Sequence, residues 1–326
     1  MFVKFPLRPI LRPVLIFLFI MSFYQALVSG GVLPASDGVS LLQNNIVKTQ
    51  RYVYQDNSDL KMVMVGSSLA ANLNIKDIGE GVKSIALGGG ASQTGLEIVK
   101  RSKTKPPIVL VEINDTIVRK IDTELMDSLY HPLFYWLRQY LPMMREEYRP
   151  ISIFVDVFKS RSKPSQKVTR EALDRLEGRY LTPDLSQKAI QTIVDIQSQP
   201  LSEQDAEAIK KEAEFIKIQI AEIQKNSGAK VVLFDIPQES RVNAAIRRKQ
   251  VQELAKKLFP SDRFEWLPPP KEREWRTNDG IHLIRSDARD FAEFLRDKLL
   301  STVATGSVGT APIKKLVIYI ELWNTT

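Results

Sequence analysis

The stretch Asp279-Gly280-Ile281-His282 holds two side chains that together can activate a serine nucleophile, in a chain of 326 residues with only two histidines. An imidazole with a pKa near neutrality can take the proton of a serine hydroxyl, and a carboxylate can orient that imidazole. Asp279 stands three residues before His282. Far upstream, an apolar run ends in Gly66-Ser67-Ser68-Leu69. These residue types predict Ser/His/Asp chemistry, with His282 as the base and Asp279 as its orienting carboxylate.

Each of these residues also has an ordinary structural interpretation. Gly-Ser-Ser is a common turn sequence, and a serine there can cap a helix. A single histidine is more often structural than catalytic. The second histidine, His131, stands beside Pro132 in an aromatic stretch without a nearby carboxylate. We interpret His131 as a packing or substrate-lining residue.

Two further segments complete a pattern with these residues. Gly88-Gly89-Gly90 follows one apolar run, and Asn114-Asp115 follows another. The order Ser, Gly, Asn, Asp-x-x-His resembles the SGNH (GDSL-type) esterase and acyltransferase superfamily. The loop before His282 and the later Ala288, Phe291 and Leu295 are similar to the family's last block. The resemblance covers about residues 60–118 and 228–300.

The resemblance implies a role for each matched residue. The family's first block, Gly-Asp-Ser-Leu, aligns with Gly66-Ser67-Ser68-Leu69, so that Ser68 is the expected nucleophile. The expected oxyanion donors are the backbone N–H of Ser68, a glycine N–H and the side-chain N–H of Asn114. Gly90 is the closest match for that glycine, and Gly88 and Gly89 stay open.

The chain departs from the family pattern at two positions. Ser67 replaces the aspartate of the first block, and Glu112 stands where the family usually has glycine, two residues before Asn114. Related Gly-Ser-Ser patterns occur in exported acyltransfer branches that handle alginate and teichoic acid. The resemblance therefore implies an ester hydrolase or O-acyltransferase acting on acyl groups, above all acetyl groups, of an envelope polysaccharide. The alternatives are a non-catalytic scaffold that binds a glycan or a protein partner, and a soluble periplasmic lipase or thioesterase.

Short apolar runs alternate with amphipathic segments along the chain. The runs 60–66, 83–87, 107–113, 230–236 and 264–267 predict strands, and 92–102, 202–226, 241–258 and 286–300 predict helices. Ser202 and Asp205 form a capping-box-like start, and Ser227-Gly228 ends that helix. The alternation predicts a three-layer α/β/α sandwich with a mainly parallel, flavodoxin-like sheet. In such a sheet the candidate residues converge beyond the carboxyl ends of the strands.

The sequence further predicts an α/β domain over 33–300 that contains a helical insertion at about 119–227. This insertion would build a cap or a substrate groove. It includes an aromatic stretch at 130–144 and a basic loop at 160–170. A small satellite core is the favoured interpretation of the aromatic stretch, with sugar stacking or contact with a membrane as alternatives. Residues 301–326 are a tail or an edge strand, the latter at 313–323.

The N-terminus is typical of a targeting or anchoring segment. Lys4, Arg8 and Arg12 precede a charge-free stretch over 13–36, and 13–32 is just long enough to span a bilayer. We expect residues 1–32 to be a signal anchor, with the N-terminus in the cytoplasm and the domain on the other side. The alternative is a signal peptide cleaved near Ser29-Gly30-Gly31.

Composition excludes several other chemistries. The absence of cysteine rules out disulfides and thiolate metal sites, and two histidines leave little room for zinc. There is no phosphate-binding Gly-x-x-x-x-Gly-Lys-Ser/Thr loop and no dinucleotide fingerprint. The net charge of +8 is interleaved with acids and forms no nucleic-acid stripe. No metal or organic cofactor is expected, and the sequence does not separate hydrolase from transferase or fix the oligomeric state.

Overall fold

The computed structural model describes residues 7–161 and 183–305. Within them, one sheet contains β1 (Met62–Val65), β2 (Val82–Ser84), β3 (Ile108–Glu112), β4 (Lys230–Phe234) and β5 (Glu265–Trp266). Its spatial order is β2-β1-β3-β4-β5, and every pair is parallel. The predicted α/β class with a parallel sheet is confirmed, and all five predicted strand regions contribute a strand.

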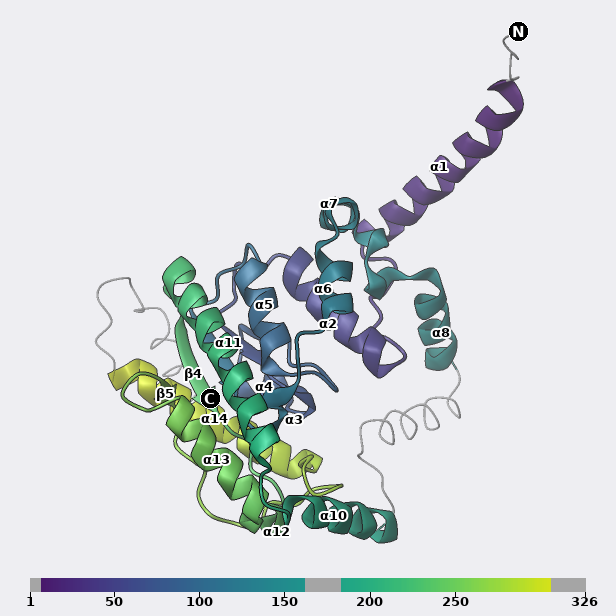
Figure 1. Ribbon diagram of the computed structural model, residues 1–326. Coiled ribbons are helices and arrows are strands. Elements are labelled where there is room, and N and C mark those ends of the chain that lie inside the picture. Colours follow the sequence, from purple (N-terminus) through teal and green to yellow (C-terminus); the bar gives the residue numbers. More distant parts are fainter. Residues whose placement is uncertain (1–6, 162–182, 306–326) are drawn as a thin grey trace, which may run out of the picture.

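Helices lie before, between and after the strands (Figure 1). The longer α-helices are α1 (Leu7–Ser29), α2 (Leu41–Tyr54), α5 (Ser92–Arg101), α6 (Thr123–Tyr130), α7 (Pro132–Tyr140), α8 (Pro150–Arg161), α10 (Pro183–Gln197), α11 (Glu203–Ser227), α13 (Ile246–Leu258) and α14 (Arg285–Thr305). The shorter helices are α3 (Ser68–Ala71), α4 (Ile75–Ile78), η1 (Asp115–Val118), η2 (Pro142–Met144), η3 (Glu146–Tyr148) and α12 (Ser240–Ala244).

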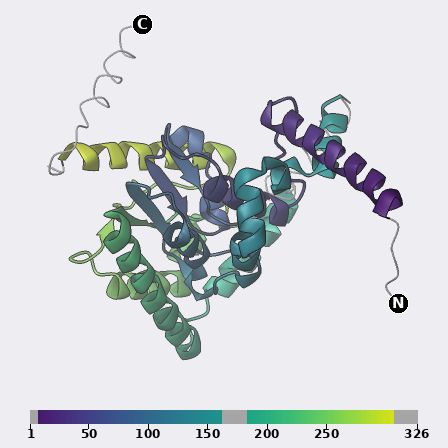
Figure 2. The same cartoon turned by 90° about the horizontal axis from the view of Figure 1, so that it is seen from above.

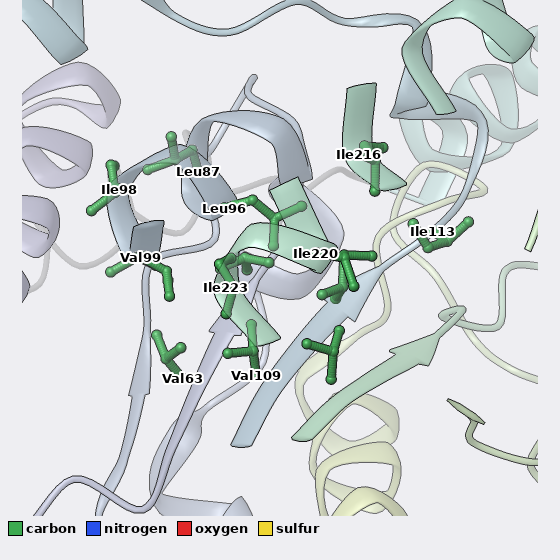
Figure 3. Close-up of a cluster of buried hydrophobic side chains, with 14 of the residues drawn as sticks. Val63, Leu87, Leu96, Ile98, Val99, Val109, Ile113, Ile216, Ile220 and Ile223 are labelled. Atoms are coloured by element: carbon green, nitrogen blue, oxygen red, sulfur yellow. The ribbon is translucent and has the colours of Figure 1, made fainter. Parts of the chain in front are cut away.

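The sheet is buried on both faces because alternate strand residues point to opposite sides. Val63, Val65, Val109 and Val111 belong to a cluster with residues of α2, α5, α11 and α13. Figure 3 shows part of that cluster, where α5 and α11 cover the strands. The intervening residues, such as Met64 and Leu110, pack on the other face against α3, α4 and α14. Figure 2 shows α14 on one side of the strands and the green helices on the other, which gives the predicted three layers.

Helix α11 matches its sequence signals closely. The side chain of Ser202 accepts a hydrogen bond of 3.1 Å from the backbone N–H of Asp205, which caps the helix. Gly228 ends the helix in the left-handed region at φ 65°, where a side chain would be strained. The predicted apolar stripe of Ile209, Ile216, Ile220 and Ile223 is fully buried.

The predicted helix over 241–258 is wrong as a single element. It is divided at Ala245, which is extended at φ −65° and ψ 149°, into α12 and α13. The carboxylate of Glu239 caps α12 by accepting hydrogen bonds from the N–H groups of Arg241 and Val242. After the break, α13 buries the side chain of Arg248 completely, and Arg248 bonds to Asp235. The hydrophobic periodicity of the sequence does not show a buried ion pair of this kind, and it therefore did not predict the change of helix direction at Ala245.

The aromatic stretch divides between core and surface. Tyr130 and Tyr135 pack against the main core and do not form a separate satellite core. In α7, Leu133, Phe134, Trp136 and Tyr140 are exposed, and no residue of this helix is fully buried. The predicted basic loop at 160–170 begins inside α8, and its residues from 162 on lie outside the described residues. The proposed edge strand at 313–323 also lies outside them.

One described helix has the length and apolarity of a membrane span. Within α1, Leu11–Ser29 comprises 19 residues with mean hydropathy 1.8, and only 6% of the window is buried. So little burial distinguishes this segment from the core helix of a soluble protein, although a signal sequence passes the same test. The N-terminal apolar helix expected from the sequence is therefore present.

Candidate active site

Ser68 stands where a buried strand turns into a helix. Strand β1 ends at Val65, Gly66 and Ser67 make the turn, and Ser68 is the first residue of α3. The hydroxyl of Ser67 is fully buried and accepts a hydrogen bond of 3.2 Å from the N–H of Leu69, which caps α3. Ser67 therefore has the structural role that a turn serine predicts, and Ser68 is left half-buried at the carboxyl end of the sheet.

His282 connects Ser68 with Asp279. Its Nε2 lies 2.9 Å from Oγ of Ser68, and its Nδ1 lies 2.7 Å from Oδ2 of Asp279. The two side chains at the ends of this chain of hydrogen bonds come from loops 211 residues apart in sequence. The structure thus brings together the three residues that the sequence analysis selected. In this geometry the bond to Asp279 fixes which imidazole nitrogen faces the serine.

A compact turn sets the position of Asp279. Its Oδ1 accepts hydrogen bonds from the backbone N–H groups of Ile281 at 3.1 Å and His282 at 2.8 Å. Gly280 has φ 98°, a conformation that favours glycine, and its N–H donates to Oγ1 of Thr277 at 3.0 Å. The spacing of three residues is therefore what allows one carboxylate to bond both the backbone and the ring of His282.

The same turn determines the charge state of the carboxylate. Burial raises the pKa of Asp279, but the hydrogen bonds from His282 and Ile281 and the attraction of His282 lower it more. The net result is a pKa below the ordinary value of 3.8. Asp279 is ionised at neutral pH and can stabilise a protonated imidazole.

The glycine cluster offers its N–H groups unequally. The N–H of Gly88 donates to Oδ1 of Asn45 at 3.0 Å, and that of Gly90 donates to the carbonyl of Leu87 at 2.9 Å. Gly89, at φ 74°, leaves open space where a Cβ would stand, and none of the described residues accepts a hydrogen bond from its N–H. The N–H of Gly90, the closest match to the family, is thus engaged in this conformation, whereas that of Gly89 has no acceptor within the described part of the chain.

Asn114 is buried at the end of β3. Its Oδ1 accepts hydrogen bonds from the backbone N–H and the hydroxyl of Thr116, at 2.8 and 2.7 Å, and so caps η1. Its Nδ2 donates to Oε1 of Glu112 at 2.7 Å. An amide nitrogen carries two hydrogens, so one donor hydrogen of Asn114 remains for a ligand.

Sequence reasoning noted Glu112 only as a departure from the family pattern. The structure shows that this side chain, 1% exposed, links two parts of the site. Its Oε2 accepts a hydrogen bond of 2.5 Å from the backbone N–H of Ser67, while Oε1 accepts the one from Asn114. Burial raises the pKa of Glu112 to about 7, and the bonds from Ser67 lower it in part. The sequence signal that could have identified Glu112 was a charged residue at the end of a run predicted to be a buried strand.

A second buried charge lies beside this one. Arg248 is fully buried, and its Nη2 lies 2.7 Å from Oδ2 of Asp235. Its Nη1 lies 3.9 Å from Oδ1 of Asp115. Attraction by these two aspartates and by Glu112 outweighs burial and raises the pKa of Arg248. The sequence pattern treats Arg248 as one of many basic residues on an amphipathic helix and gives no hint of this role.

Helix α10, from the predicted insertion, lies against the histidine loop. The hydroxyl of Ser186 donates to the carbonyl of Asn278 at 2.5 Å, and Nε2 of Gln197 donates to Oδ2 of Asp115 at 3.2 Å. These two residues are near opposite ends of α10, so that this helix extends from the Asp279 turn to the end of β3. It forms one wall beside the carboxyl edge of the sheet.

His131 lies in a different environment. It precedes α7, is exposed, and its ring centroid lies 5.1 Å from that of Phe134. The hydrogen bond to Ser68 comes from His282.

A cavity of about 740 Å³ opens beyond β4 and β5, lined in part by Asn114, Asp235 and Trp266. The lining of this cavity does not include the triad.

Among the residues that the structure describes, no group of three or more His, Asp or Glu side chains is arranged to hold a metal ion. Comparison of the sequence with protein-family models and with curated proteins gave no match. The geometry of Ser68, His282 and Asp279 is therefore the main basis for a functional proposal.

Proposed function

We propose that this chain is an SGNH-type serine esterase or O-acyltransferase that acts on ester-linked acyl groups. The observation that carries the proposal is the continuous chain of hydrogen bonds from Ser68 through His282 to Asp279. A serine hydroxyl needs a base to become a nucleophile, and His282 is positioned for this. The ionised Asp279 supplies the charge that stabilises the imidazolium.

The reaction would proceed in two steps. Oγ of Ser68 attacks the ester carbonyl carbon while Nε2 of His282 takes its proton, which places negative charge on the carbonyl oxygen. Collapse of this intermediate breaks the bond to the alcohol, which leaves with the proton from His282, and the acyl group stays on Ser68. Water or a sugar hydroxyl then gives its proton to Nε2 of His282 and attacks the acyl carbon. The bond to Oγ of Ser68 breaks as His282 returns that proton to Oγ, which releases an acid or a new ester and restores the site.

The oxyanion formed in each step needs hydrogen-bond donors. The second hydrogen of the Asn114 amide supports a role for this residue as a donor to the oxyanion, together with the backbone N–H of Ser68. A glycine from the 88–90 turn would be the third donor. The family resemblance favours Gly90, and the free N–H favours Gly89.

The proposed substrate class follows from the sequence around Ser68 and from helix α1. The Gly66-Ser67-Ser68 sequence resembles that of exported acyltransfer branches, and α1 is consistent with a signal anchor. Acetyl groups on a cell-envelope or exported polysaccharide are therefore the proposed substrate, with the domain outside the cytoplasm and the N-terminus inside.

The decisive experiment measures turnover of p-nitrophenyl acetate by the detergent-solubilised full-length chain. We expect Ser68→Ala and His282→Ala to abolish turnover, and His131→Ala, the matched histidine control, to retain it. A fluorophosphonate should label the wild type and spare Ser68→Ala. Turnover that survives both triad substitutions would refute the mechanism. No turnover together with no labelling would instead favour the non-catalytic binding scaffold.

The acceptor is identified in a second assay. Adding oligosaccharides to a working esterase separates transfer, which yields acetylated sugar, from hydrolysis, which yields acetate alone. Fractionation tests the anchor, since a mature chain that begins near residue 30 and washes off membranes would show that the N-terminal segment is a cleaved signal peptide.

A further inference from the structure

Six large apolar side chains are exposed on one region of the domain, over α7 and the first residues of α8. They are Leu133, Phe134, Trp136, Tyr140, Ile151 and Phe154, and the last two are each 71% exposed. Exposed large apolar side chains that gather on one region of a surface mark a contact with a protein or a membrane more often than free surface. We call these six residues the apolar platform.

The platform lies at the end of α1. The lower end of α1 meets the domain between α7 and α8 (Figure 1). The chain itself provides the link, because α7 is followed directly by η2 and η3, and η3 is followed directly by α8. Helix α1 packs against η2, the first of these connecting turns.

Helix α1 is fixed to the domain by specific contacts near its C-terminus. The hydroxyl of Tyr24 donates to the carbonyl of Tyr148 at 2.6 Å, and the N–H of Met143 donates to Oε1 of Gln25 at 3.1 Å. Val28, four residues after Tyr24, is only 4% exposed. The last two turns of α1 therefore contact the domain directly.

This attachment limits how far the domain can stand from a bilayer. The apolar segment Leu11–Ser29 has 19 residues, which as a helix measure about 28 Å, close to the roughly 30 Å of a hydrocarbon core. Almost the whole segment is needed to cross. Tyr24 and Gln25 then lie near the membrane surface, and the turns that bond to them, with α7 and α8, are brought against the headgroups.

The chemistry of the platform suits this position. Trp136 and Tyr140, whose ring centroids are 5.5 Å apart, are the residue types enriched at membrane–water interfaces. The sequence that spans the platform, 131–154, contains two acidic residues, Glu146 and Glu147. Both are buried and are paired with arginines, Glu146 with Arg149 at 3.0 Å and Glu147 with Arg51 at 2.6 Å, so that neither carboxylate is presented to an anionic headgroup.

We infer that the apolar platform is a lipid-binding surface that rests on the bilayer beside α1. This inference rests on the proposed anchor, because a cleaved α1 would not hold the platform at a membrane. Because α7 and α8 contact the lipid on either side of α1, the domain is held at a fixed tilt and at a fixed distance from the bilayer. The partner is the lipid surface itself, and docking of a membrane protein on the platform is the competing outcome.

The absence of cysteine makes a site-specific test possible, because any introduced thiol is unique. Bimane is attached to Trp136→Cys, Phe154→Cys, Phe17→Cys within α1, or Asp262→Cys at an exposed turn before β5. Each full-length variant is reconstituted in phosphatidylcholine/phosphatidylglycerol vesicles that contain lipids with a nitroxide near the headgroup or deep in the acyl chain.

We expect the deep nitroxide to quench the label at 17 and the shallow one to quench the labels at 136 and 154. The label at 262 should keep its fluorescence with both lipids. If 17 is quenched while 136 and 154 behave like 262, the anchor stands and the lipid platform is wrong, which favours a protein partner. If 17 is not quenched either, the anchor fails as well. Turnover of p-nitrophenyl acetate in detergent should be unchanged in all four variants, which reports that they are folded.

Discussion

Oε1 of Glu112 accepts a hydrogen bond of 2.7 Å from Nδ2 of Asn114, so that a buried carboxylate holds the amide proposed to face the oxyanion. The other oxygen of the same carboxylate accepts a hydrogen bond from the backbone N–H of Ser67, the residue before Ser68. Glu112 thus fixes the end of β1 relative to the end of β3, because its side chain connects the two strand ends.

The first prediction concerns how stability depends on pH through Glu112. Burial raises its pKa from 4.5 to about 7, and the nearby Asp235 and Asp115 add to the rise while the Ser67 N–H opposes it. Between these two values the folded protein keeps a proton that the unfolded chain has released. This group therefore makes the folded state less stable as pH rises from 4.5 to about 7, and its contribution is constant above that range.

Replacing Glu112 by glutamine removes that titration. Across pH 4.5 to 7, the free energy of unfolding should rise with pH more steeply, or fall less, in Glu112→Gln than in the wild type. Because a single group binds at most one proton, the two plots of unfolding free energy against pH can differ in slope by at most about 1.4 kcal/mol per pH unit. Urea unfolding at several pH values measures it, with Glu253→Gln at an exposed position as control. Equal slopes in Glu112→Gln and the wild type would show that Glu112 does not titrate in this range.

The second prediction concerns Asn114 as an oxyanion donor. We expect Asn114→Ala to lower kcat for p-nitrophenyl acetate by roughly 100- to 1000-fold with little change in KM, because such donors act mainly on the transition state. Asn114 also caps η1, so thermal unfolding is measured in parallel and kinetics are taken where the variant is folded. A folded variant with wild-type kcat would remove Asn114 from the oxyanion hole.

The third prediction concerns the carboxylate of Asp279. In Asp279→Asn, Oδ1 can still accept the backbone N–H groups of Ile281 and His282, but an NH₂ group replaces Oδ2. That group donates a hydrogen bond to Nδ1 of His282, which places the ring proton on Nε2. A protonated Nε2 cannot accept the proton of Ser68. We expect kcat to fall by a factor on the order of 10⁴ at neutral pH. Asp262→Asn, at an exposed position, should leave kcat unchanged. Retained activity in Asp279→Asn would show that another group orients His282.

The sequence was sufficient for the parts of this structure that follow from local patterns. Apolar runs that end in Gly-Ser or Asn-Asp predicted strands that end at the site, and the spacing of Asp279 and His282 predicted that this carboxylate orients the imidazole. Because the carboxyl ends of parallel strands meet at one edge, Ser68 could be placed beside His282 without a contact map.

The features that were missed depend on contacts between distant segments. A pattern reading places charged residues in solvent, whereas Glu112 and Arg248 are buried because their partners come from other elements. The break at Ala245 and the exposure of α7 were missed for the same reason. Helical periodicity in a sequence does not show which other segments pack against a helix. In the run of three glycines, only the hydrogen bonds to Asn45 and Leu87 distinguish one N–H from another.

The last prediction concerns the space that Gly66 leaves for Glu112. A Cβ at Gly66 would lie 2.5 Å from Oε2 of Glu112 and 2.7 Å from Cβ of Ala70. Neither atom can withdraw freely, because the carboxylate is held by Ser67 and the methyl group belongs to α3. We expect Gly66→Ala to cost about 1–3 kcal/mol of stability, as overpacking of a core does. It should also lower kcat at temperatures where the variant is folded, because Glu112 and the start of α3 must both shift.

Gly95→Ala is the matched control for this effect. Gly95 lies in α5, and a Cβ there would lie 2.7 Å from Cβ of Val65, the last residue of β1, so that this variant should be destabilised by a similar amount. It does not press on Glu112 or on α3, and kcat of the folded fraction should stay near that of the wild type. Chemical denaturation together with p-nitrophenyl acetate turnover distinguishes the two effects. Equal losses of kcat in the two variants would mean that packing behind β1, and not the Glu112 link, controls the position of Ser68.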